Sequence, residues 1–444
     1  MTTINVDFNH INGKIKPMHA VNNGPIKAAS EQSRGNFESF RNAKIPYVRN
    51  HDASFYAGYG GEHTVDVHAI FPDFSKNPYD PDSYDFTLTD IYTQTIIDAG
   101  SKVFYRLGSK IEHWPKHYGT LVPADFNKWA VICEHIIRHY NCGWANGFHF
   151  NIEYWEIWNE ADGIAGNGSQ PNWSGTPEEY YELYRVASIH LKKRFPHLKI
   201  GGPSLSSLAE DREWLSNFLS YITTNGERAP LDFFSWHSYN ACPRRIEKGV
   251  KLANQYLAKA GYFETEKILN EINYLENWTD KFVSSIENIV GIHGAAYTSA
   301  CMAMGQKAGL DMLMYYDARP ATAFNGMFDF YTFKPLKGYY PFVMFSKLYE
   351  LGNCVETCSD NDNLYVVSAK NENENAIMLT HYREDKTEFV ESVIMKLNGV
   401  DDGEWQVEIL DKEKTMEKSL LNVVGGFLEF EIKEDTIYLL TKQS

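Results

Sequence analysis

The sequence has no stretch of the kind that carries a chain into or across a membrane. Its first residues, MTTINVDFNH, contain neither the basic nor the apolar segment of a secretory leader, and no run of about 18 apolar residues occurs elsewhere. These absences predict a protein that has no membrane partner and is located in the cytoplasm.

Cysteine is scarce, and its spacing is irregular. Three residues separate Cys354 from Cys358, but no second pair stands at zinc-ribbon spacing. We therefore expect free thiols and a reducing compartment. The cysteines concerned are Cys133, Cys142, Cys242, Cys301, Cys354 and Cys358.

Several catalytic motifs are also missing. None of the 15 histidines stands two residues from another or in an HExxH pattern, which argues against a metal-dependent hydrolase. The chain contains no Gly-rich phosphate loop and no GxSxG turn, so neither a nucleotide cofactor nor a serine nucleophile is indicated. We expect no metal and no cofactor.

Positive charge is in deficit. Lys and Arg number 42 against 58 Asp and Glu, which gives a formal net charge of −16 at pH 7. Polyanions such as nucleic acid or an acidic membrane surface are poor partners for such a chain. A small neutral substrate is expected instead.

What is present between residues 16 and 351 is an alternation of short apolar runs with longer stretches of helical period. Eight strand-helix units predict an α/β fold, a closed TIM (β/α)8 barrel with its active site at the carboxyl ends of the strands. The polar segment Ala53 to Phe86 is too long for an ordinary connection and is expected to form a functional loop. The apolar runs are KPMHAVN, YVRNHD, KVFYRLG, YWEIWNE, KIGGPS, FFSWHSY, KILNEINY and MLMYYDA.

The pattern changes at residue 352. From 352 to 444, short and partly alternating runs such as NAIMLTHY, EWQVEIL and FLEFEI are separated by turns, which predicts an antiparallel β-sandwich. The alternating piece TINVDF, within residues 1–15, is expected to join it. The smaller domain would then be built from both chain ends and act as a stabilising accessory without chemistry.

Two of the eight apolar runs deliver a carboxylic acid to the end of a strand. YWEIWNE ends in Glu160, and KILNEINY carries Glu271, 271 − 160 = 111 residues later. A Glu at a strand end is usually just solvated. Two that face each other across a barrel would instead suit glycosidic bond cleavage, in which one protonates the leaving oxygen and the other attacks or activates water. A separation of about 5 Å would indicate retention of configuration, and about 6.5–9.5 Å inversion.

The motifs YWEIWNE, WHSY and LNEINY, in this order, resemble those of clan A glycoside hydrolases. Together with terminal strands that flank the barrel, they resemble family 39, known best for β-xylosidases and α-L-iduronidases, over essentially the whole chain. The resemblance implies a retaining mechanism with Glu160 as acid/base and Glu271 as nucleophile. It also implies that Asn159 bonds the 2-hydroxyl of the sugar and that His237 and Tyr239 line the site.

The chain departs from the family pattern in two places. The Pro that usually follows the Asn-Glu pair is replaced by Ala161-Asp162. The segment YYDARPATAFNGMFDF, after the eighth strand, does not match a xylosidase pattern, and it is where hydroxyls remote from the cleaved bond would be recognised.

Other residues near the strand ends have two interpretations each. Arg49 is expected inside the barrel near one of the acids, either as a purely structural ion pair or as a group that tunes the carboxylates. His51 fits sugar binding better than a core position. Trp114 either stacks on a sugar or packs its loop. Asp317 and Arg319 either bond sugar hydroxyls, which we favour, or pair with each other.

The sequence therefore predicts a retaining, exo-acting, β-xylosidase-like glycosidase that acts on small oligosaccharides or glycosides. The alternatives are another clan A specificity, such as α-L-arabinofuranosidase or β-galactosidase, and a carbohydrate-binding barrel without catalysis. A homo-oligomer is a further expectation from the resemblance, because an appended sandwich often contributes contacts between barrels.

Overall fold

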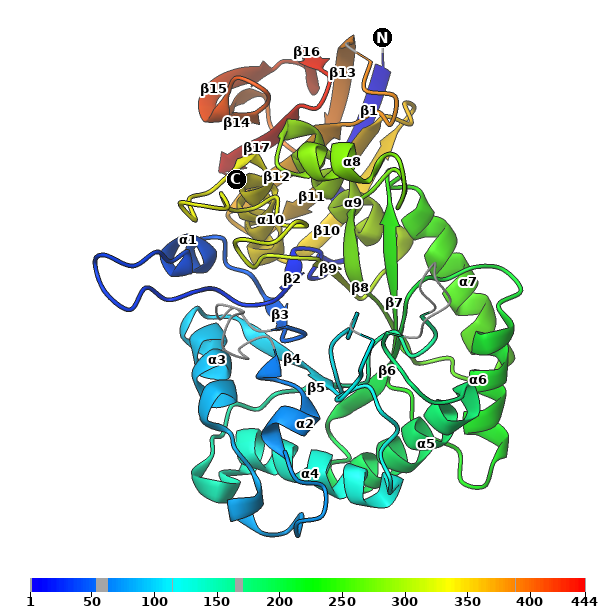
Figure 1. Ribbon diagram of the computed structural model, residues 1–444. Coiled ribbons are helices and arrows are strands. Elements are labelled where there is room, and N and C mark those ends of the chain that lie inside the picture. Colours follow the sequence, from blue (N-terminus) through cyan, green and yellow to red (C-terminus); the bar gives the residue numbers. More distant parts are fainter. Residues whose placement is uncertain (1, 53–62, 114, 164–170, 388, 444) are drawn as a thin grey trace.

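The computed structural model describes residues 2–52, 63–113, 115–163, 171–387 and 389–443. Within them, eight parallel strands close into one barrel, so the predicted architecture is confirmed (Figure 1). Neighbouring strands follow chain order, and the last pairs with the first. They are β2 (Ala20–Asn22), β3 (Tyr47–Arg49), β4 (Lys102–Leu107), β5 (Tyr154–Ile157), β6 (Lys199–Leu205), β7 (Phe233–Asn240), β8 (Glu266–Tyr274) and β9 (Met312–Tyr315).

Helices surround the barrel and connect its strands (Figure 1). The segment between β8 and β9 contains two helices, with Gly291 between them. The described part of the expected long loop from Ala53 to Phe86 contains the short helix α2 and a 3-10 turn at Pro81–Ser83. The helices are α1 (Phe37–Asn42), α2 (Val67–Ile70), α3 (Thr87–Asp98), α4 (Phe126–Cys142), α5 (Pro177–Arg194), α6 (Glu213–Thr224), α7 (Arg245–Lys259), α8 (Phe282–Ile289), α9 (Ile292–Ala308) and α10 (Tyr340–Leu351).

The two long helices beside β5 are bounded by strong local signals. The α5 helix begins with a capping box between Thr176 and Glu179, with Pro177 in the first turn. The α4 helix begins at the N-cap Asp125 and ends at Gly143, whose φ of 72° is left-handed and favours glycine. These signals fix where the chain turns back toward the barrel on each side of β5.

The smaller domain is one sheet of nine strands in the order β15-β14-β17-β12-β11-β10-β1-β13-β16. Strand β1 (Thr2–Lys14) lies between β10 and β13, so both ends of the chain contribute, as predicted. The edge strands β15 and β16 contact each other, because the sheet coils around its own core of residues such as Ile4, Val6 and Trp405. The other strands are β10 (Asn353–Ser359), β11 (Leu364–Lys370), β12 (Glu374–His381), β13 (Val390–Asn398), β14 (Gly403–Leu410), β15 (Thr415–Val423), β16 (Phe427–Lys433) and β17 (Ile437–Gln443).

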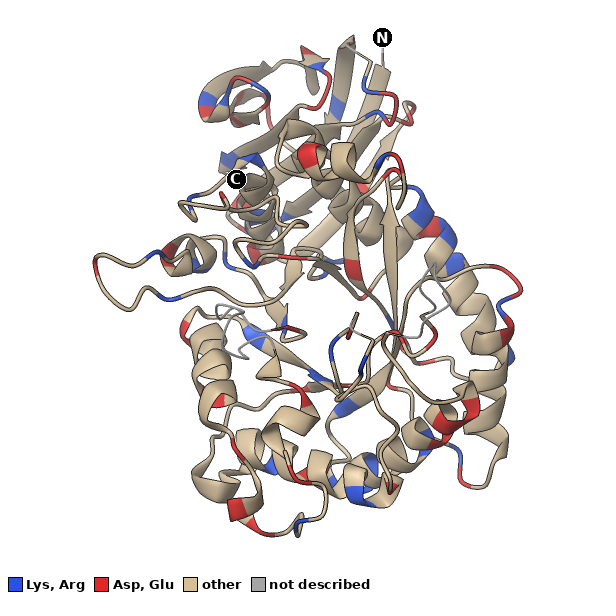
Figure 2. Ribbon diagram, viewed as in Figure 1, with Lys and Arg blue, Asp and Glu red and all other residues tan. Residues whose placement is uncertain are grey.

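The predicted fold class is thus confirmed, whereas the division of the chain at residues 15 and 351 stays a prediction. All six cysteines are free, as expected. No helix within the described residues is both long and apolar enough to span a membrane. Figure 2 shows positively and negatively charged residues mixed over the helices around the barrel.

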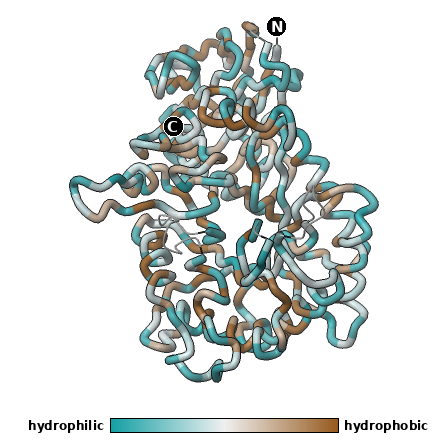
Figure 3. The backbone as a smooth tube through the Cα atoms, viewed as in Figure 1, coloured by the Kyte–Doolittle hydropathy of each residue, from teal (hydrophilic) through white to brown (hydrophobic). Residues whose placement is uncertain are grey.

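The inside of the barrel changes from apolar to polar along its axis. Buried side chains close the end of the barrel at which the strands begin. Figure 3 shows hydrophobic and hydrophilic stretches alternating along the chain in the barrel and in the smaller domain. The apolar residues at this end are Ala20, Tyr47, Phe104, Tyr154, Phe233, Ile268, Met312 and Met314. Two residues further along six of these strands come the polar residues Asn22, Arg49, Arg106, Glu156, Ser235 and Asn270, each with an exposed fraction of 0%. Alternate residues of a strand face the same side, so these polar side chains point into the barrel. They form a layer between the apolar end of the barrel and the carboxyl ends of the strands.

Candidate active site

Glu160 and Glu271 reach the same cavity from two separated strands. Glu160 lies three residues beyond the end of β5, the fourth barrel strand, and Glu271 lies in the second half of β8, the seventh. The cavity they share has a volume of about 510 Å³. Its lining also includes His51, Ile111, His113, Gly163, Pro171, Asn172, Ser206, Ser207, Tyr239, Trp278, Tyr316 and Phe324.

The two carboxylates are close neighbours. One oxygen of each and one nitrogen of His237 lie within 4.8 Å of one another. His237 Nδ1 is 2.6 Å from Glu160 Oε1 and 3.4 Å from Glu271 Oε2, so the imidazole lies between the two acids. An oxygen-oxygen distance below 4.8 Å is compatible with the separation of about 5 Å between the two carboxyl groups of enzymes in which one carboxylate attacks directly.

Arg49 joins Glu271 to the polar layer below. Its Nη1 donates to Glu271 Oε1 at 2.7 Å, its Nε donates to Glu156 Oε2 at 2.7 Å, and its Nη2 donates to Asn159 Oδ1 at 2.7 Å. Glu156 also accepts bonds from Ser235 and Asn270. The expectation that Arg49 lies inside the barrel near an acid is confirmed, and the guanidinium fixes the position of Glu271 through three charged or polar partners.

The environments of the two acids differ. Burial raises the pKa of Glu160 to about 7, against the opposing effects of the Arg49 charge and a hydrogen bond from Asn172. Burial also raises the pKa of Glu271, while the positive charge of Arg49 opposes this. Because Glu271 accepts hydrogen bonds from both Arg49 and Tyr239, a proton shared by the pair belongs on Glu160. Burial lowers the pKa of His237, which keeps its ring neutral.

Irregular backbone aims these side chains. The register of β7 against β8 shifts between Trp236 and His237, which sets His237 directly opposite Glu271. Trp158 and Glu160 have φ values of 75° and 47°, so the alternation of β5 stops before the acid. Strict alternation along β5 would place Trp158 on the same side as Glu160, and the structure does not have this arrangement.

Trp158 instead packs outside the barrel. Its ring lies 6.1 Å from that of Trp129 and 5.0 Å from that of Trp173, and its Nε1 donates to Asn172 O. The positive φ at Trp158 turns its side chain away from the site.

Some of the remaining predicted site residues line the cavity, and the others do not. His51 and Tyr239 line the cavity, with His51 Nε2 3.8 Å from Glu271 Oε1 and Tyr239 OH donating to Glu271 Oε2 at 2.7 Å. Asn159 is buried beside Glu160, and its Nδ2 has no hydrogen-bond partner among the described residues. Asp317 and Arg319 pair with each other at 3.3 Å.

Asp317 and Arg319 are not among the residues that line the cavity. Arg319 also lies 3.4 Å from Asp52, which follows His51. The alternative in which the two residues pair is thus the geometry observed, and their contact with sugar hydroxyls stays a prediction. Trp114 lies outside the described residues.

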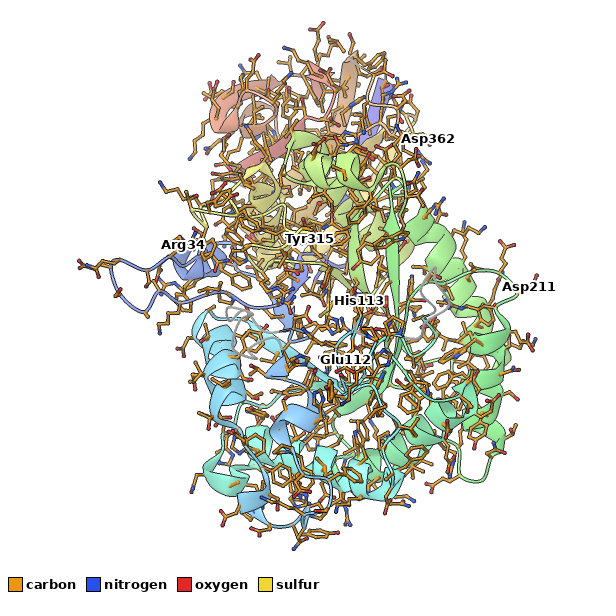
Figure 4. All side chains as sticks on the ribbon, viewed as in Figure 1. Arg34, Glu112, His113, Asp211, Tyr315 and Asp362 are labelled. Atoms are coloured by element: carbon orange, nitrogen blue, oxygen red, sulfur yellow. The ribbon has the colours of Figure 1, made fainter. Side chains whose placement is uncertain are left out.

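Several other residues line the cavity or bond its acids without belonging to a motif that is recognisable in the sequence. Asn172 Nδ2 donates to Glu160 Oε2 at 3.0 Å, and Trp278, 60% exposed, packs against Tyr239 and Phe324 at the rim. His113 follows β4 and lies near the middle of the barrel in Figure 4. Trp278 stands seven residues after Glu271 in the loop that follows β8, a position where an aromatic residue could have been suspected.

Two groups of described residues have ligand atoms close enough to hold a metal ion: Glu160, His237 and Glu271, and separately His63, Asp66 and His68. In each group one carboxylate already forms an ion pair with an arginine. Arg49 bonds Glu271, and Arg106 Nη2 lies 2.5 Å from Asp66 Oδ1. A second cation at either place would be repelled by the arginine.

Replacing Arg49 with Met is expected to lower the free energy of unfolding by about 3–5 kcal/mol, because it leaves the Glu156 and Glu271 carboxylates buried without their partner. Urea titration followed by tryptophan fluorescence measures the change. The control is Arg185→Met, which breaks a pair with Glu182 that is 22% and 31% exposed and should cost about 0.2–1 kcal/mol. Equal losses in the two variants would contradict the prediction.

Comparison with known proteins gives relatives in sequence and in fold. Two curated β-xylosidases match, from Caldicellulosiruptor saccharolyticus (29% identical over 167 residues) and Geobacillus stearothermophilus (30% over 172). The aligned parts cover 35% and 36% of this chain and 31% of each relative, so the chain matches about a third of their length. A crystal structure of a glucosidase from Croceicoccus marinus is similar in fold, with a TM-score of 0.80, 20% identity and coverage of 99% of this chain and 98% of that one.

The family comparison covers a larger part of the sequence. The model of glycosyl hydrolases family 39 matches residues 5–287, which include the strands that carry Glu160, His237 and Glu271. The match extends over more than half of the 444 residues. The chain therefore belongs to glycosyl hydrolases family 39.

Proposed function

We propose that the protein is a retaining, exo-acting glycosidase, β-xylosidase-like, that hydrolyses O-glycosidic bonds of small oligosaccharides or glycosides. The observation that carries the proposal is the pair of carboxylates in one cavity, with oxygens within 4.8 Å of each other. Membership of family 39 and the similarity to two curated β-xylosidases support it. The six free cysteines favour action in a reducing compartment such as the cytoplasm.

In the first step, a carboxylate oxygen of Glu271 attacks the anomeric carbon, and the bond from that carbon to the leaving oxygen breaks. Glu160, whose raised pKa of about 7 leaves a large fraction of it protonated at neutral pH, gives its proton to the leaving oxygen. Arg49 and Tyr239 hold Glu271 in its charged form until it attacks. The product of this step is a glycosyl ester on Glu271.

In the second step, water replaces the departed group. Glu160, now a carboxylate, takes a proton from the water as its oxygen attacks the anomeric carbon, and the ester bond to Glu271 breaks. Two inversions at the same carbon give net retention. Asn159 has an unpartnered Nδ2 beside the acid, which supports a contact to the 2-hydroxyl of the bound sugar.

A panel of nitrophenyl glycosides tests the proposal. We expect nitrophenol to be released fastest from the β-D-xyloside, compared with the β-D-glucoside, the β-D-galactoside and the α-L-arabinofuranoside. Faster release from another glycoside would show that the protein is a glycosidase with a specificity other than that for xylosides. A protein that is stabilised against heat by these sugars but releases no nitrophenol would be a carbohydrate-binding barrel, and the proposal would fail.

A further inference from the structure

Asp162, two residues after Glu160, has a carboxylate with no exposed surface. The carboxylate accepts hydrogen bonds from Ser206 N at 3.0 Å, from Ser206 Oγ at 2.9 Å and from Arg212 Nη2. A buried carboxylate is costly unless it is paired and bonded in this way. Asp162 is therefore committed to the segment that follows β6.

Arg212 completes a link between two loops at the rim of the barrel. Besides Asp162, its guanidinium bonds the carbonyl and the hydroxyl of Ser207. Ser206 and Ser207 both line the cavity that holds Glu160 and Glu271. The contacts of Asp162 and Arg212 thus tie the turn after β5 to the segment after β6, within the wall of the candidate active site.

The turn that carries the acid needs such support. Glu160 has a φ of 47°, a left-handed conformation that is unfavourable for a residue with a side chain. Two backbone hydrogen bonds hold the turn, from Glu160 N to Ser204 O and from Gly163 N to Glu160 O. In family members with the usual Asn-Glu-Pro sequence, the proline ring restricts the backbone here, whereas this chain has Ala161 and Asp162.

We propose that Asp162 and Arg212 are positioning residues that hold the turn Glu160 to Gly163 so that the carboxyl of Glu160 faces the leaving oxygen of the glycoside. This inference rests on the proposed function and names two residues to which that function assigns no role. Neither touches the reacting atoms, and both act through the backbone of the turn and the wall formed by Ser206 and Ser207.

The pair also has an electrostatic consequence for Glu160. The positive charge of Arg212 lowers the pKa of Glu160. The negative charges of Glu160 and Asp162 repel each other, so an ionised Asp162 disfavours the ionised form of Glu160. In the intact pair the two effects oppose each other. Removing one partner should therefore move the pKa of Glu160 in a direction that depends on which charge is lost.

The first experiment compares leaving groups. With aryl β-D-xylosides, kcat/KM reports the step in which Glu160 donates its proton, and a dinitrophenyl group leaves without that proton whereas a phenyl group needs it. Asp162→Asn and Arg212→Gln should each lower kcat/KM about 10- to 100-fold for the phenyl xyloside and change it less than about 3-fold for the dinitrophenyl xyloside. Arg212→Gln keeps the test available if Asp162→Asn does not fold.

The second experiment records the pH dependence of kcat/KM. Asp162→Asn leaves Arg212 unopposed, so the pKa of Glu160 falls and the alkaline limb moves to lower pH. Arg212→Gln leaves Asp162 unopposed, so the alkaline limb moves to higher pH. The double variant should return the limb toward the wild-type position while the loss on the phenyl xyloside remains.

The control is Asp232→Asn, which removes a paired but partly exposed carboxylate at the other end of the barrel. Asp232 accepts hydrogen bonds there from Lys192 Nζ at 2.8 Å and from Ile200 N at 2.8 Å. It should leave both the leaving-group dependence and the pH profile unchanged. Equal losses on every aryl xyloside without a shift of the alkaline limb would reduce Asp162 and Arg212 to structural residues and overturn the inference. If instead Glu271→Ala keeps full turnover, the proposed function itself fails, so the two failures are distinguishable.

Discussion

Replacing Glu271 with Ala is expected to reduce turnover of aryl xylosides by about 10⁵-fold or more, equivalent to about 7 kcal/mol of transition-state stabilisation. Without this carboxylate no covalent intermediate can form, because no other carboxylate among the lining residues lies on the same side of the anomeric carbon in the proposed arrangement. Initial rates of nitrophenol release measure the loss.

Azide distinguishes loss of the nucleophile from loss of the fold. In the Glu271→Ala variant a small anion can occupy the space of the missing carboxylate and attack the anomeric carbon once, giving a glycosyl azide of inverted configuration. The matched control is Glu266→Ala, at the other end of the same strand, where the side chain bonds Lys199 and Tyr154 far from the cavity. That variant should keep its activity within a few-fold. Retained turnover in Glu271→Ala would remove the proposed mechanism.

The parts of this site that could be predicted from sequence are those set by strand geometry. Eight apolar runs alternating with helical stretches predict a closed barrel, in which the carboxyl ends of all the strands lie on one face. The convergence of Glu160 and Glu271 follows from their places at the ends of the fourth and seventh strands. The alternation of side chains placed Arg49 inside the barrel. Both inferences use regular backbone, which the sequence encodes locally.

What could not be predicted depends on irregular backbone and on loops that meet in space. The alternation of side chains along the strand fails at Trp158, because φ there is positive. No residue type in YWEIWNE predicts this positive φ. The bond of Asp162 with Arg212 joins residues from two loops 50 positions apart. Strand β15 has little hydrophobic alternation in the sequence, because it is an edge strand whose residues are mostly exposed.

The chemistry of the acid is the second strong prediction. Glu160→Ala should lower kcat/KM of the phenyl xyloside by about 10²- to 10⁴-fold, because the leaving oxygen then departs without its proton. The dinitrophenyl xyloside should react in its first step at close to the wild-type rate, and the glycosyl ester on Glu271 should accumulate because no base activates water. A burst of dinitrophenol followed by slow steady release measures this behaviour.

The pH profile gives an independent check on the same residue. In the wild type, kcat/KM should fall as pH rises through about 7, because Glu160 loses the proton it must donate. In Glu160→Ala this alkaline limb should disappear. The control is Glu153→Ala, which removes a carboxyl directly before β5, at the end of that strand away from the cavity, and this variant should keep the limb. Azide should speed release from the glycosyl ester of the Glu160→Ala variant with net retention, since Glu271 is still present and the anion needs no base. An alkaline limb that persists without Glu160, or azide product of inverted configuration, would assign the proton to another group and exchange the roles given to the two acids.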